Sequence, residues 1–143
     1  MNQYWNKLHN KYTKEDWIDK PSLFAQSIIK YFPKTGQIID IGGGQGQDSR
    51  FFAENGYKVT LTDVSDKGLD YAKEKLKKKL KDKMSIQKLD ISQPLPMPNK
   101  SYDITYAHLI LHYFTHATTI QIINEIYRGG YPFLWTPCLH SNG

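Results

Sequence analysis

A run of glycines between acidic residues stands near the middle of the first half of the chain. The segment "IIDIGGGQG" at 38–46 places its glycines directly after an apolar run; they are Gly42, Gly43, Gly44 and Gly46. Glycine tolerates positive φ and lets a ligand lie directly against the backbone. Asp40 and Asp48 flank the loop, and their charge would repel a pyrophosphate but attract a cation. The segment therefore predicts a backbone-lined site for a small, positively charged molecule.

Two other kinds of glycine-rich loop do not fit these residues. A Walker loop needs a lysine next to its last glycine, and none stands there. A dinucleotide fingerprint, G-x-G-x-x-G, would need a third glycine where the chain has Gln47 or Ser49, depending on its starting glycine. An NAD-dependent oxidoreductase is therefore a distant alternative.

Two more aspartates follow later apolar runs. Asp63 ends "VTLTD", 21 residues after Gly42, where a carboxylate can accept from both hydroxyls of a ribose. Asp90 stands in "KLDIS", where its carboxylate can accept from an adenine amino group while the Ile91 backbone reads the ring edge. Together with the glycine loop, these residues predict a nucleoside site.

The elements that must position these residues alternate between strand and helix. Strands are predicted at 37–41, 57–62, 84–89, 102–106 and 129–135. Helices are predicted at 47–55, through the lysine-rich segment after a cap at Ser65 or Asp66, and from about Ala107 into 118–128. Pro21 is expected to open an earlier helix. This order predicts an α/β, Rossmann-like, mostly parallel sheet of order 3-2-1-4-5 with helices on both faces and ligands at its carboxyl edge.

At these residues the sequence resembles the class I S-adenosylmethionine-dependent methyltransferases. "IIDIGGGQG" matches their D-x-G-x-G-x-G motif, "VTLTDVS" matches the acidic end of their second strand, and "LDISQPLPMPNKSYDITYAHLILHYF" matches their third and fourth strands. The resemblance covers about residues 36–128, and "GQGQDSRFFAENGYKVTLTD" is similar to the small-molecule, tellurite-resistance-like branch.

The resemblance implies S-adenosyl-L-methionine as cofactor and S-adenosyl-L-homocysteine as product. It implies that Asp40 and 42–46 approach the methionine portion, that Asp63 holds the ribose and that Asp90 and Ile91 hold the adenine. Val64 is expected to be a further cofactor-binding residue. It further implies that Ala107 and His108 face the transferred methyl group. The acceptor is expected to be a small molecule.

Methyl transfer from a sulfonium depends mainly on alignment, so few catalytic residues are needed. If the acceptor must lose a proton, His108, His112 or Tyr106 could act as the base. His108, His112 and His116 recur at four-residue spacing, but aromatic neighbours favour packing over a metal site, and no metal is expected.

The N-terminal 35 residues are predicted to be a helical region ahead of a core at 36–143, within a single domain. Its aromatic residues could form a lid over the cofactor by attraction to the sulfonium, or could simply fix the helices to the core; they are Tyr4, Trp5, Tyr12 and Trp17.

The end of the chain departs from the family pattern. "NEIYRGGYPFLWTPCLHSNG" leaves no room for the last two strands of the usual seven-stranded sheet, which predicts a truncated form with an exposed edge. That edge leads us to expect a homodimer, formed edge to edge or by exchange of the C-terminal segment, with a tail shielding the monomer as the alternative. A catalytically impaired cofactor-binding or interaction module is the second function hypothesis.

Composition and charge indicate which partners and which compartment to expect for the protein. The net charge of +5 comes from residues 73–83, which hold seven lysines against two acids. We expect this run to be solvated surface and not a nucleic-acid or membrane site. The absence of a long apolar run and of a signal-peptide pattern, together with a single cysteine, Cys138, predicts a cytoplasmic protein.

Overall fold

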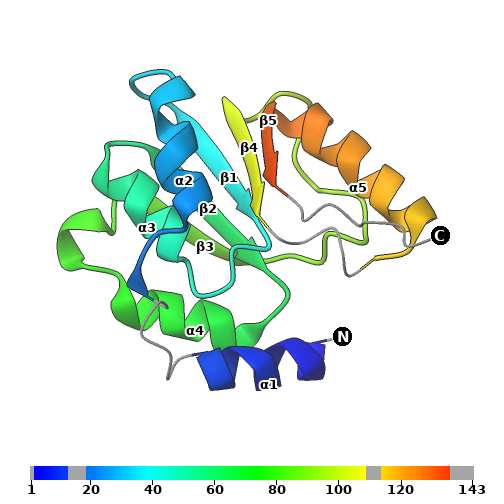
Figure 1. The fold of residues 1–143 in the computed structure, drawn as a ribbon, viewed down its shortest axis with the longest axis horizontal. Helices are drawn as coiled ribbons and strands as arrows, with labels where there is room; N and C mark the ends of the chain where they lie inside the picture. Colours follow the sequence, from blue (N-terminus) through cyan, green and yellow to red (C-terminus); the bar gives the residue numbers. More distant parts are fainter. Residues whose placement is uncertain (1, 13–18, 109–113, 136–143) are drawn as a thin grey trace.

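One parallel sheet forms the centre of the molecule. The computed structural model describes residues 2–12, 19–108 and 114–135. Its strands follow the order β3-β2-β1-β4-β5, and every pairing between neighbours is parallel (Figure 1). The strands are β1 (Gln37–Ile41), β2 (Lys58–Asp63), β3 (Met84–Lys88), β4 (Ile104–His108) and β5 (Tyr131–Trp135). The predicted Rossmann-like α/β fold is confirmed.

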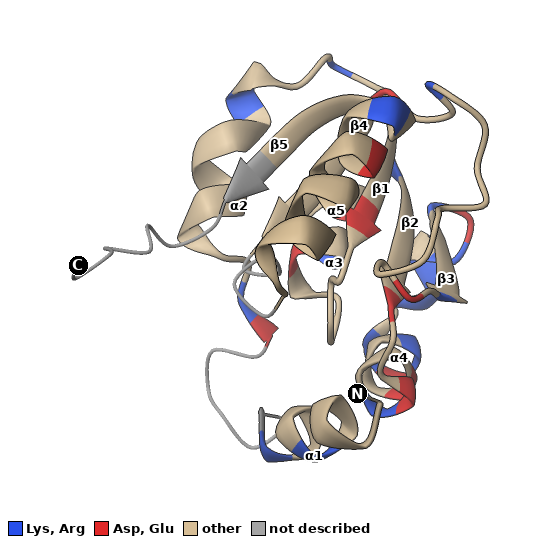
Figure 2. Cartoon of the chain, turned by 90° about the vertical axis from the view of Figure 1, so that its right-hand side faces the viewer, with Lys and Arg blue, Asp and Glu red and all other residues tan. Residues whose placement is uncertain are grey.

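Helices cover both faces of this sheet. The described helices are α1 (Asn2–Tyr12), α2 (Leu23–Ile28), α3 (Gln47–Glu54), α4 (Asp66–Lys75) and α5 (His116–Gly129), with short 3-10 turns at Ile29–Tyr31 and Lys78–Leu80. In Figure 1, α2 and α3 lie on one side of the sheet and α5 on the other. Figures 1 and 2 both show α1 beside α4, away from the sheet. The division of the chain at residue 35 stays a prediction.

The residues of β1 supply both hydrophobic cores, because successive side chains of a strand point to opposite faces. Ile38 packs into the cluster that includes Phe52 of α3. Ile39 and Ile41 pack into the other cluster, which includes Ile126 of α5. This burial on both faces fixes β1, and with it the loop that follows, in the middle of the sheet.

Side-chain caps set the beginnings of two helices near the carboxyl edge. The Ser65 hydroxyl accepts a hydrogen bond from the Gly68 amide at 3.1 Å, as predicted for the start of α4. Ser22 caps α2 by accepting from the Ala25 amide at 3.0 Å. The prediction that Pro21 opens this helix was wrong, since α2 begins after the Ser22 cap.

Two other expectations about helices were wrong. Residues 107–108 continue β4, because Ala107 pairs with Ile41 in the parallel ladder, and the next described helix begins only at His116. The lysine run is helical only to Lys75, where α4 ends; most of it forms turns and a short 3-10 segment. Its lysines are mostly exposed, as expected of solvated surface.

The segment between β3 and β4 is tied to α5 by Arg128. The guanidinium donates to the carbonyl oxygens of Met97 at 2.6 Å and Leu95 at 2.9 Å, and it pairs with Glu125 at 2.7 Å. The Glu125 carboxylate in turn accepts from the Leu95 amide at 2.9 Å. Arg128 holds the pKa of Glu125 below its usual range. The network fixes a segment that would otherwise have few regular partners.

Candidate functional site

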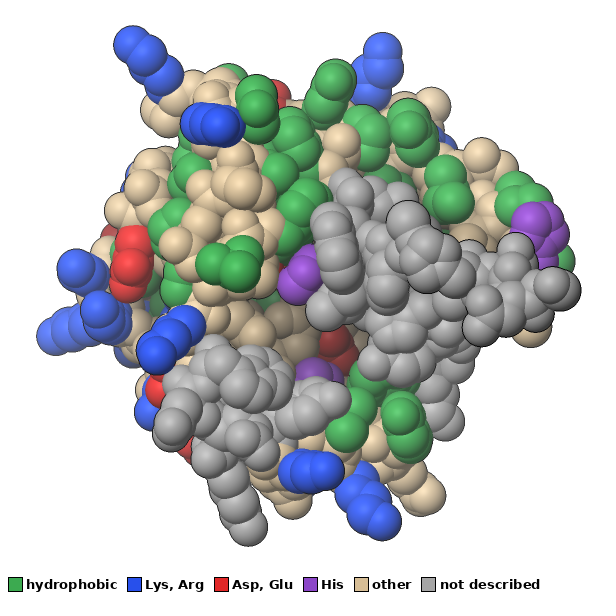
Figure 3. All heavy atoms as spheres, viewed as in Figure 1, with side chains coloured by type: hydrophobic (Ala, Val, Ile, Leu, Met, Phe, Trp, Pro, Cys, Tyr) green, Lys and Arg blue, Asp and Glu red, His purple; other side chains and the backbone are tan. Residues whose placement is uncertain are grey.

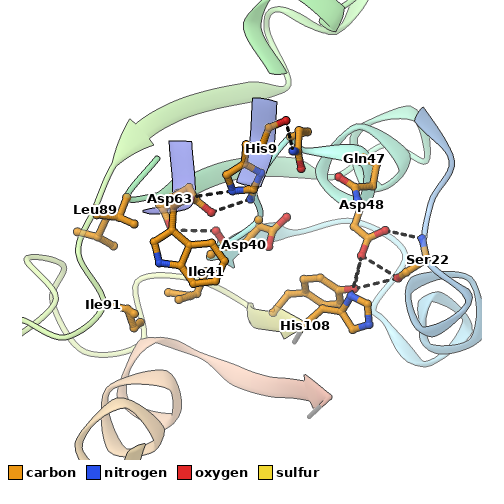
Figure 4. Close-up of a pocket in the computed structure, with 18 of the residues that line it drawn as sticks. His9, Ser22, Asp40, Ile41, Gln47, Asp48, Asp63, Leu89, Ile91 and His108 are labelled. Carbon is orange, nitrogen blue, oxygen red and sulfur yellow. Dashed lines mark hydrogen bonds and ion pairs between the residues drawn. The ribbon is translucent and has the colours of Figure 1, made fainter. Parts of the chain in front are cut away.

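A cavity of about 610 Å³ opens at the carboxyl ends of the central strands. Figure 3 shows the hollow, with histidine and acidic side chains inside it, and Figure 4 shows the residues around it. In an open parallel sheet this edge, where the strand order reverses between β1 and β4, is the expected place for a ligand. The volume lies within the usual range of small-molecule sites.

The glycine loop forms the floor of the cavity through Gly42, Gly43 and Gly44. The Gly43 amide donates to the Thr62 carbonyl of β2 at 2.9 Å, and the loop closes with the Gly46 amide donating to Gly43 at 3.0 Å. Gly46, at φ +77°, caps α3 and is not among the residues that line the cavity. The loop thus exposes peptide groups where a side chain would fill the space.

Asp63 lies at the end of β2 with both carboxylate oxygens in use. One accepts from the Gly44 amide and the other from the Ser65 amide, each at 2.8 Å. These bonds fix the carboxylate between the glycine loop and the start of α4, and its residue is only 7% exposed. Val64 lines the cavity beside it. An oxygen that accepts one amide keeps a second lone pair, so the carboxylate can still accept from hydroxyl groups of a ligand.

The segment that follows β3 contributes another part of the wall. Asp90 and Ile91 both line the cavity, and the Asp90 carboxylate accepts from the Ser92 amide at 2.9 Å and from its hydroxyl at 2.6 Å. Ala107 does not lie at the surface of the cavity: it is fully buried in the core between the sheet and α5. The structure therefore brings Asp90 and Ile91 to the site and leaves Ala107 behind it.

Asp40 lies beneath the glycine loop and is 1% exposed. One of its oxygens accepts from the Ser49 hydroxyl at 2.6 Å. Burial raises the pKa of Asp40 to about 8, against the opposing effect of the Ser49 bond and with a further rise from Asp48 and Asp63. At neutral pH this carboxyl therefore holds a proton in the protein without ligand.

We expect Asp40→Asn to remove a pH dependence of stability. In the unfolded chain this carboxyl has its ordinary pKa of 3.8, and in the folded chain its pKa is about 8. Between these two pH values the folded chain therefore keeps a proton that the unfolded chain has lost. Stability therefore falls as pH rises across this window, with a slope of at most about 1.4 kcal/mol per pH unit. Urea unfolding of both proteins at several pH values should show the wild type losing stability relative to the variant. If the free energies of unfolding of the two proteins changed in parallel with pH, the raised pKa of Asp40 would be wrong.

The far end of the cavity is organised around Asp48 of α3. Its carboxylate accepts from the Ser22 amide at 2.7 Å, the Ser22 hydroxyl at 2.8 Å and the Tyr106 hydroxyl at 2.5 Å. These bonds join α2, α3 and β4 (Figure 4). Burial, followed by the charge of Asp48, raises the pKa of Tyr106. Since Tyr106 donates its proton to Asp48, the geometry does not favour its predicted role as a base.

His108 lies at the end of β4 and lines this part of the cavity. Its Nδ1 is 3.8 Å from a carboxylate oxygen of Asp48, and its ring stacks on Phe24 with centroids 5.6 Å apart. Burial lowers the pKa of His108 more than the nearby Asp48 raises it, which favours a neutral imidazole. His112 lies outside the described residues. His116 begins α5, whereas His108 belongs to β4, so these two histidines do not share a helix.

The charge of the cavity suits a cationic ligand. Asp48, Asp63 and Asp90 line it, and Lys20 is the one lysine or arginine among the described residues that do. The described ion pairs of Asp48 and Asp63 involve histidines whose pKa burial lowers. A molecule with a sulfonium and an ammonium group would be attracted here, whereas a polyphosphate would be repelled.

Several lining residues were not predicted from the sequence. His9 reaches the cavity from α1, and Gln47 and Ser22 reach it from α3 and the cap of α2. Trp5, one of the predicted lid aromatics, lines the cavity and packs edge to face against Tyr4. Trp17 and the side chain of Tyr12 lie outside the described part of the chain.

The described residues show neither a metal site nor a membrane span. Among them, no group of three or more His, Cys, Asp or Glu side chains is placed to hold a metal ion. None of their helices combines the length and the apolar character needed to cross a membrane.

Comparison with known proteins defines the family. The sequence profile of a methyltransferase domain matches residues 38–130, well over half of the chain. The chain belongs to this methyltransferase family. Its sequence matches none of the curated proteins.

Solved structures share the fold at low sequence identity. An S-adenosylmethionine-dependent methyltransferase from Mesorhizobium loti has a TM-score of 0.62 and 24% identity, over 75% of this chain and 48% of its own. One from Aquifex aeolicus has a TM-score of 0.67 and 19% identity, over 90% of this chain and 69% of its own. Phosphoethanolamine N-methyltransferase 1 of Haemonchus contortus, in complex with phosphoethanolamine and S-adenosylhomocysteine, has a TM-score of 0.70 and 18% identity, over 98% of this chain and 34% of its own. The chain thus spans about half or less of two of these three proteins.

Proposed function

We propose that this protein binds S-adenosyl-L-methionine in the cavity and transfers its methyl group to a small-molecule acceptor. The observation that carries the proposal is the Asp63 carboxylate, fixed by the Gly44 and Ser65 amides beside the glycine loop. The family match and the acidic cavity support it. The Haemonchus relative has S-adenosylhomocysteine and a small amine, phosphoethanolamine, in its complex.

The residues of the cavity suit the parts of this cofactor in order. Gly42 to Gly44 and Asp40 would hold the methionine portion, Asp63 the ribose, and Asp90 with the Ile91 backbone the adenine. When bound, the cofactor supplies a methyl group on a sulfonium, so the departing group is a neutral thioether. The chain has to align the acceptor with that methyl, and alignment alone can provide a large part of the acceleration.

At the acceptor end, His108 would remove a proton from an acceptor that must lose one. Burial favours its neutral form, and its Nδ1 lies toward Asp48, whose charge would stabilise the imidazolium that forms. Asp48 would hold its place through Ser22 and Tyr106. Membership of the tellurite-resistance-like branch is also part of the proposal, and it is supported only by the similarity of the segment quoted in the sequence analysis.

Calorimetry with S-adenosylmethionine, S-adenosylhomocysteine and NAD in parallel tests the function. We expect the first two to bind with one site per chain and NAD not to bind, because its pyrophosphate would meet the acidic cavity. Binding of NAD without binding of either sulfur compound would overturn the proposal. Binding of S-adenosylmethionine without methyl transfer to any amine, hydroxyl or thiol tested would support the alternative of a binding module.

We also propose that the protein forms a homodimer through the β5 side of its sheet. In the described residues β5 pairs with β4 alone, and Tyr131 on it is 69% exposed. An open strand edge favours pairing with a second copy. Sedimentation at micromolar concentration should give the mass of a dimer, and Tyr131→Lys should weaken it. A monomer at these concentrations would contradict the proposal.

A further inference from the structure

The ring of His9 lies in a niche made by two glycines. A Cβ on Gly44 would lie 2.9 Å from His9 Cε1, and a Cβ on Gly68 would lie 3.3 Å from His9 Cδ2. Gly44, at φ +59°, belongs to the glycine loop, while Gly68 lies inside α4. The imidazole of α1 therefore packs directly on the backbone that forms the floor of the cavity.

A glycine at position 68 makes α4 less stable, and the close approach of His9 and the glycine loop explains why glycine stands there. Glycine inside a helix is less favourable than alanine by about 1 kcal/mol. Here a Cβ would also meet the Gly44 carbonyl group at 3.3 Å, so a side chain would push apart α4, the loop and His9 together. The missing side chain is what allows α1 to bring a histidine to the cavity.

Polar contacts hold α1 in this position. The side-chain oxygen of Asn6 accepts from the Ser65 hydroxyl at 2.7 Å and from the Lys67 amide at 3.2 Å, at the start of α4. The Gln45 amide group donates to the His9 carbonyl at 3.4 Å. These contacts tie α1 to the two segments that also hold Asp63.

His9 Nε2 lies 4.0 Å from a carboxylate oxygen of Asp63. This distance exceeds that of a hydrogen bond, but one oxygen atom between the two groups could bond to both. Burial lowers the pKa of His9 more than Asp63 and Gln45 raise it, which favours a neutral imidazole. A neutral imidazole nitrogen donates or accepts according to its tautomer, and a hydroxyl group does both.

We propose that His9 is a nucleoside-binding residue, whose Nε2 shares a ribose hydroxyl of the ligand with Asp63. The inference rests on the proposed function, because it needs the ribose to lie at Asp63. It assigns to α1 a direct part in recognising the ligand, in addition to covering the cavity. Figure 4 shows His9 and Asp63 facing each other across this space.

The test compares His9→Phe with the wild type, using S-adenosylhomocysteine and its 2′-deoxy and 3′-deoxy analogues in calorimetry. Phenylalanine keeps an aromatic ring in the niche but lacks the nitrogen. We expect the variant to bind S-adenosylhomocysteine about fivefold more weakly, the effect of one hydrogen bond. For one of the two deoxy analogues, wild type and variant should bind alike, since the shared hydroxyl is gone.

Two further variants make the result specific. Lys7→Ala changes an exposed residue on the same helix and should leave affinity unchanged. His9→Gln retains a hydrogen-bonding group and should recover part of the loss, which provides a second measurement if the phenylalanine variant is poorly folded.

Equal affinity of His9→Phe and wild type for S-adenosylhomocysteine would overturn the inference. The inference would also be overturned if His9→Phe lost affinity for S-adenosylhomocysteine and for both deoxy analogues by the same factor. A wild type that does not bind S-adenosylhomocysteine would instead overturn the proposed function.

Discussion

Replacing Asp63 with alanine is expected to weaken the binding of S-adenosylhomocysteine by about ten- to a hundredfold, or roughly 1–3 kcal/mol. The change would leave ribose hydroxyls without their acceptor. It would also free the Gly44 and Ser65 amides, which now donate to this carboxylate. Calorimetry or fluorescence titration of both proteins measures the loss directly.

Asp70→Ala provides the matched control for this experiment. Asp70 is an exposed carboxylate on α4, so the variant removes the same charge without touching the cavity, and affinity should stay within about twofold at physiological salt. If Asp63→Ala bound the ligand as tightly as Asp70→Ala does, the ribose would not lie at the end of β2.

The second large effect is expected at Gly43. A Cβ there would lie 2.4 Å from Leu61 Cδ1 and 2.5 Å from a carboxylate oxygen of Asp40, both in buried side chains. Overpacking of this kind typically costs about 1–3 kcal/mol. We expect Gly43→Ala to lower the free energy of unfolding by that amount. The displaced loop should also lose measurable affinity for S-adenosylhomocysteine.

Gly56→Ala separates this steric effect from the general cost of replacing a glycine. Gly56 has φ +97°, but a Cβ there would meet nothing within 4 Å, and the residue lies far from the cavity at the end of α3. Its variant should lose some stability through backbone strain while keeping full affinity. A Gly43→Ala protein with wild-type stability and affinity would show that the loop tolerates a side chain, and the steric explanation would then be wrong.

The central part of the fold could be predicted because local and global signals agree there. The run at 37–41 is apolar on both faces, as a central parallel strand requires, and β1 has these bounds. Ser65 was one of two predicted caps and is the one used. The predicted parallel sheet and its strand order, 3-2-1-4-5, are confirmed.

The errors arose where local sequence favours two structures equally. Residues 107–108 belong to an apolar stretch that would suit a helix, but pairing of Ala107 with Ile41 extends the strand. The lysine run has good helix formers, yet Leu76 leaves the helical conformation at ψ 113° and ends α4. For residues 107–108 a contact distant in sequence, which no window of residues contains, decides the outcome.

The same reason explains which site residues were found. The glycines and Asp63 carry a signal in their spacing, whereas His9 lies 54 positions before Asp63 and meets it only because α1 packs on α4. A glycine inside a predicted helix, Gly68, was the one local sign that another segment approaches closely there. Likewise, the bonds of Asp48 to Ser22 and Tyr106 depend on three elements meeting.

The central claim is that the cavity at the carboxyl edge of the sheet holds the cofactor. Titrating the nitrogen-15-labelled protein with S-adenosylhomocysteine and following its amide resonances tests this most directly. We expect the largest shifts at 42–46, 63–65 and 90–92, with a smaller change at His9 and none at the exposed lysines of 77–81. Shifts concentrated away from the glycine loop and the ends of β2 and β3, or no shifts at saturating ligand, would contradict it.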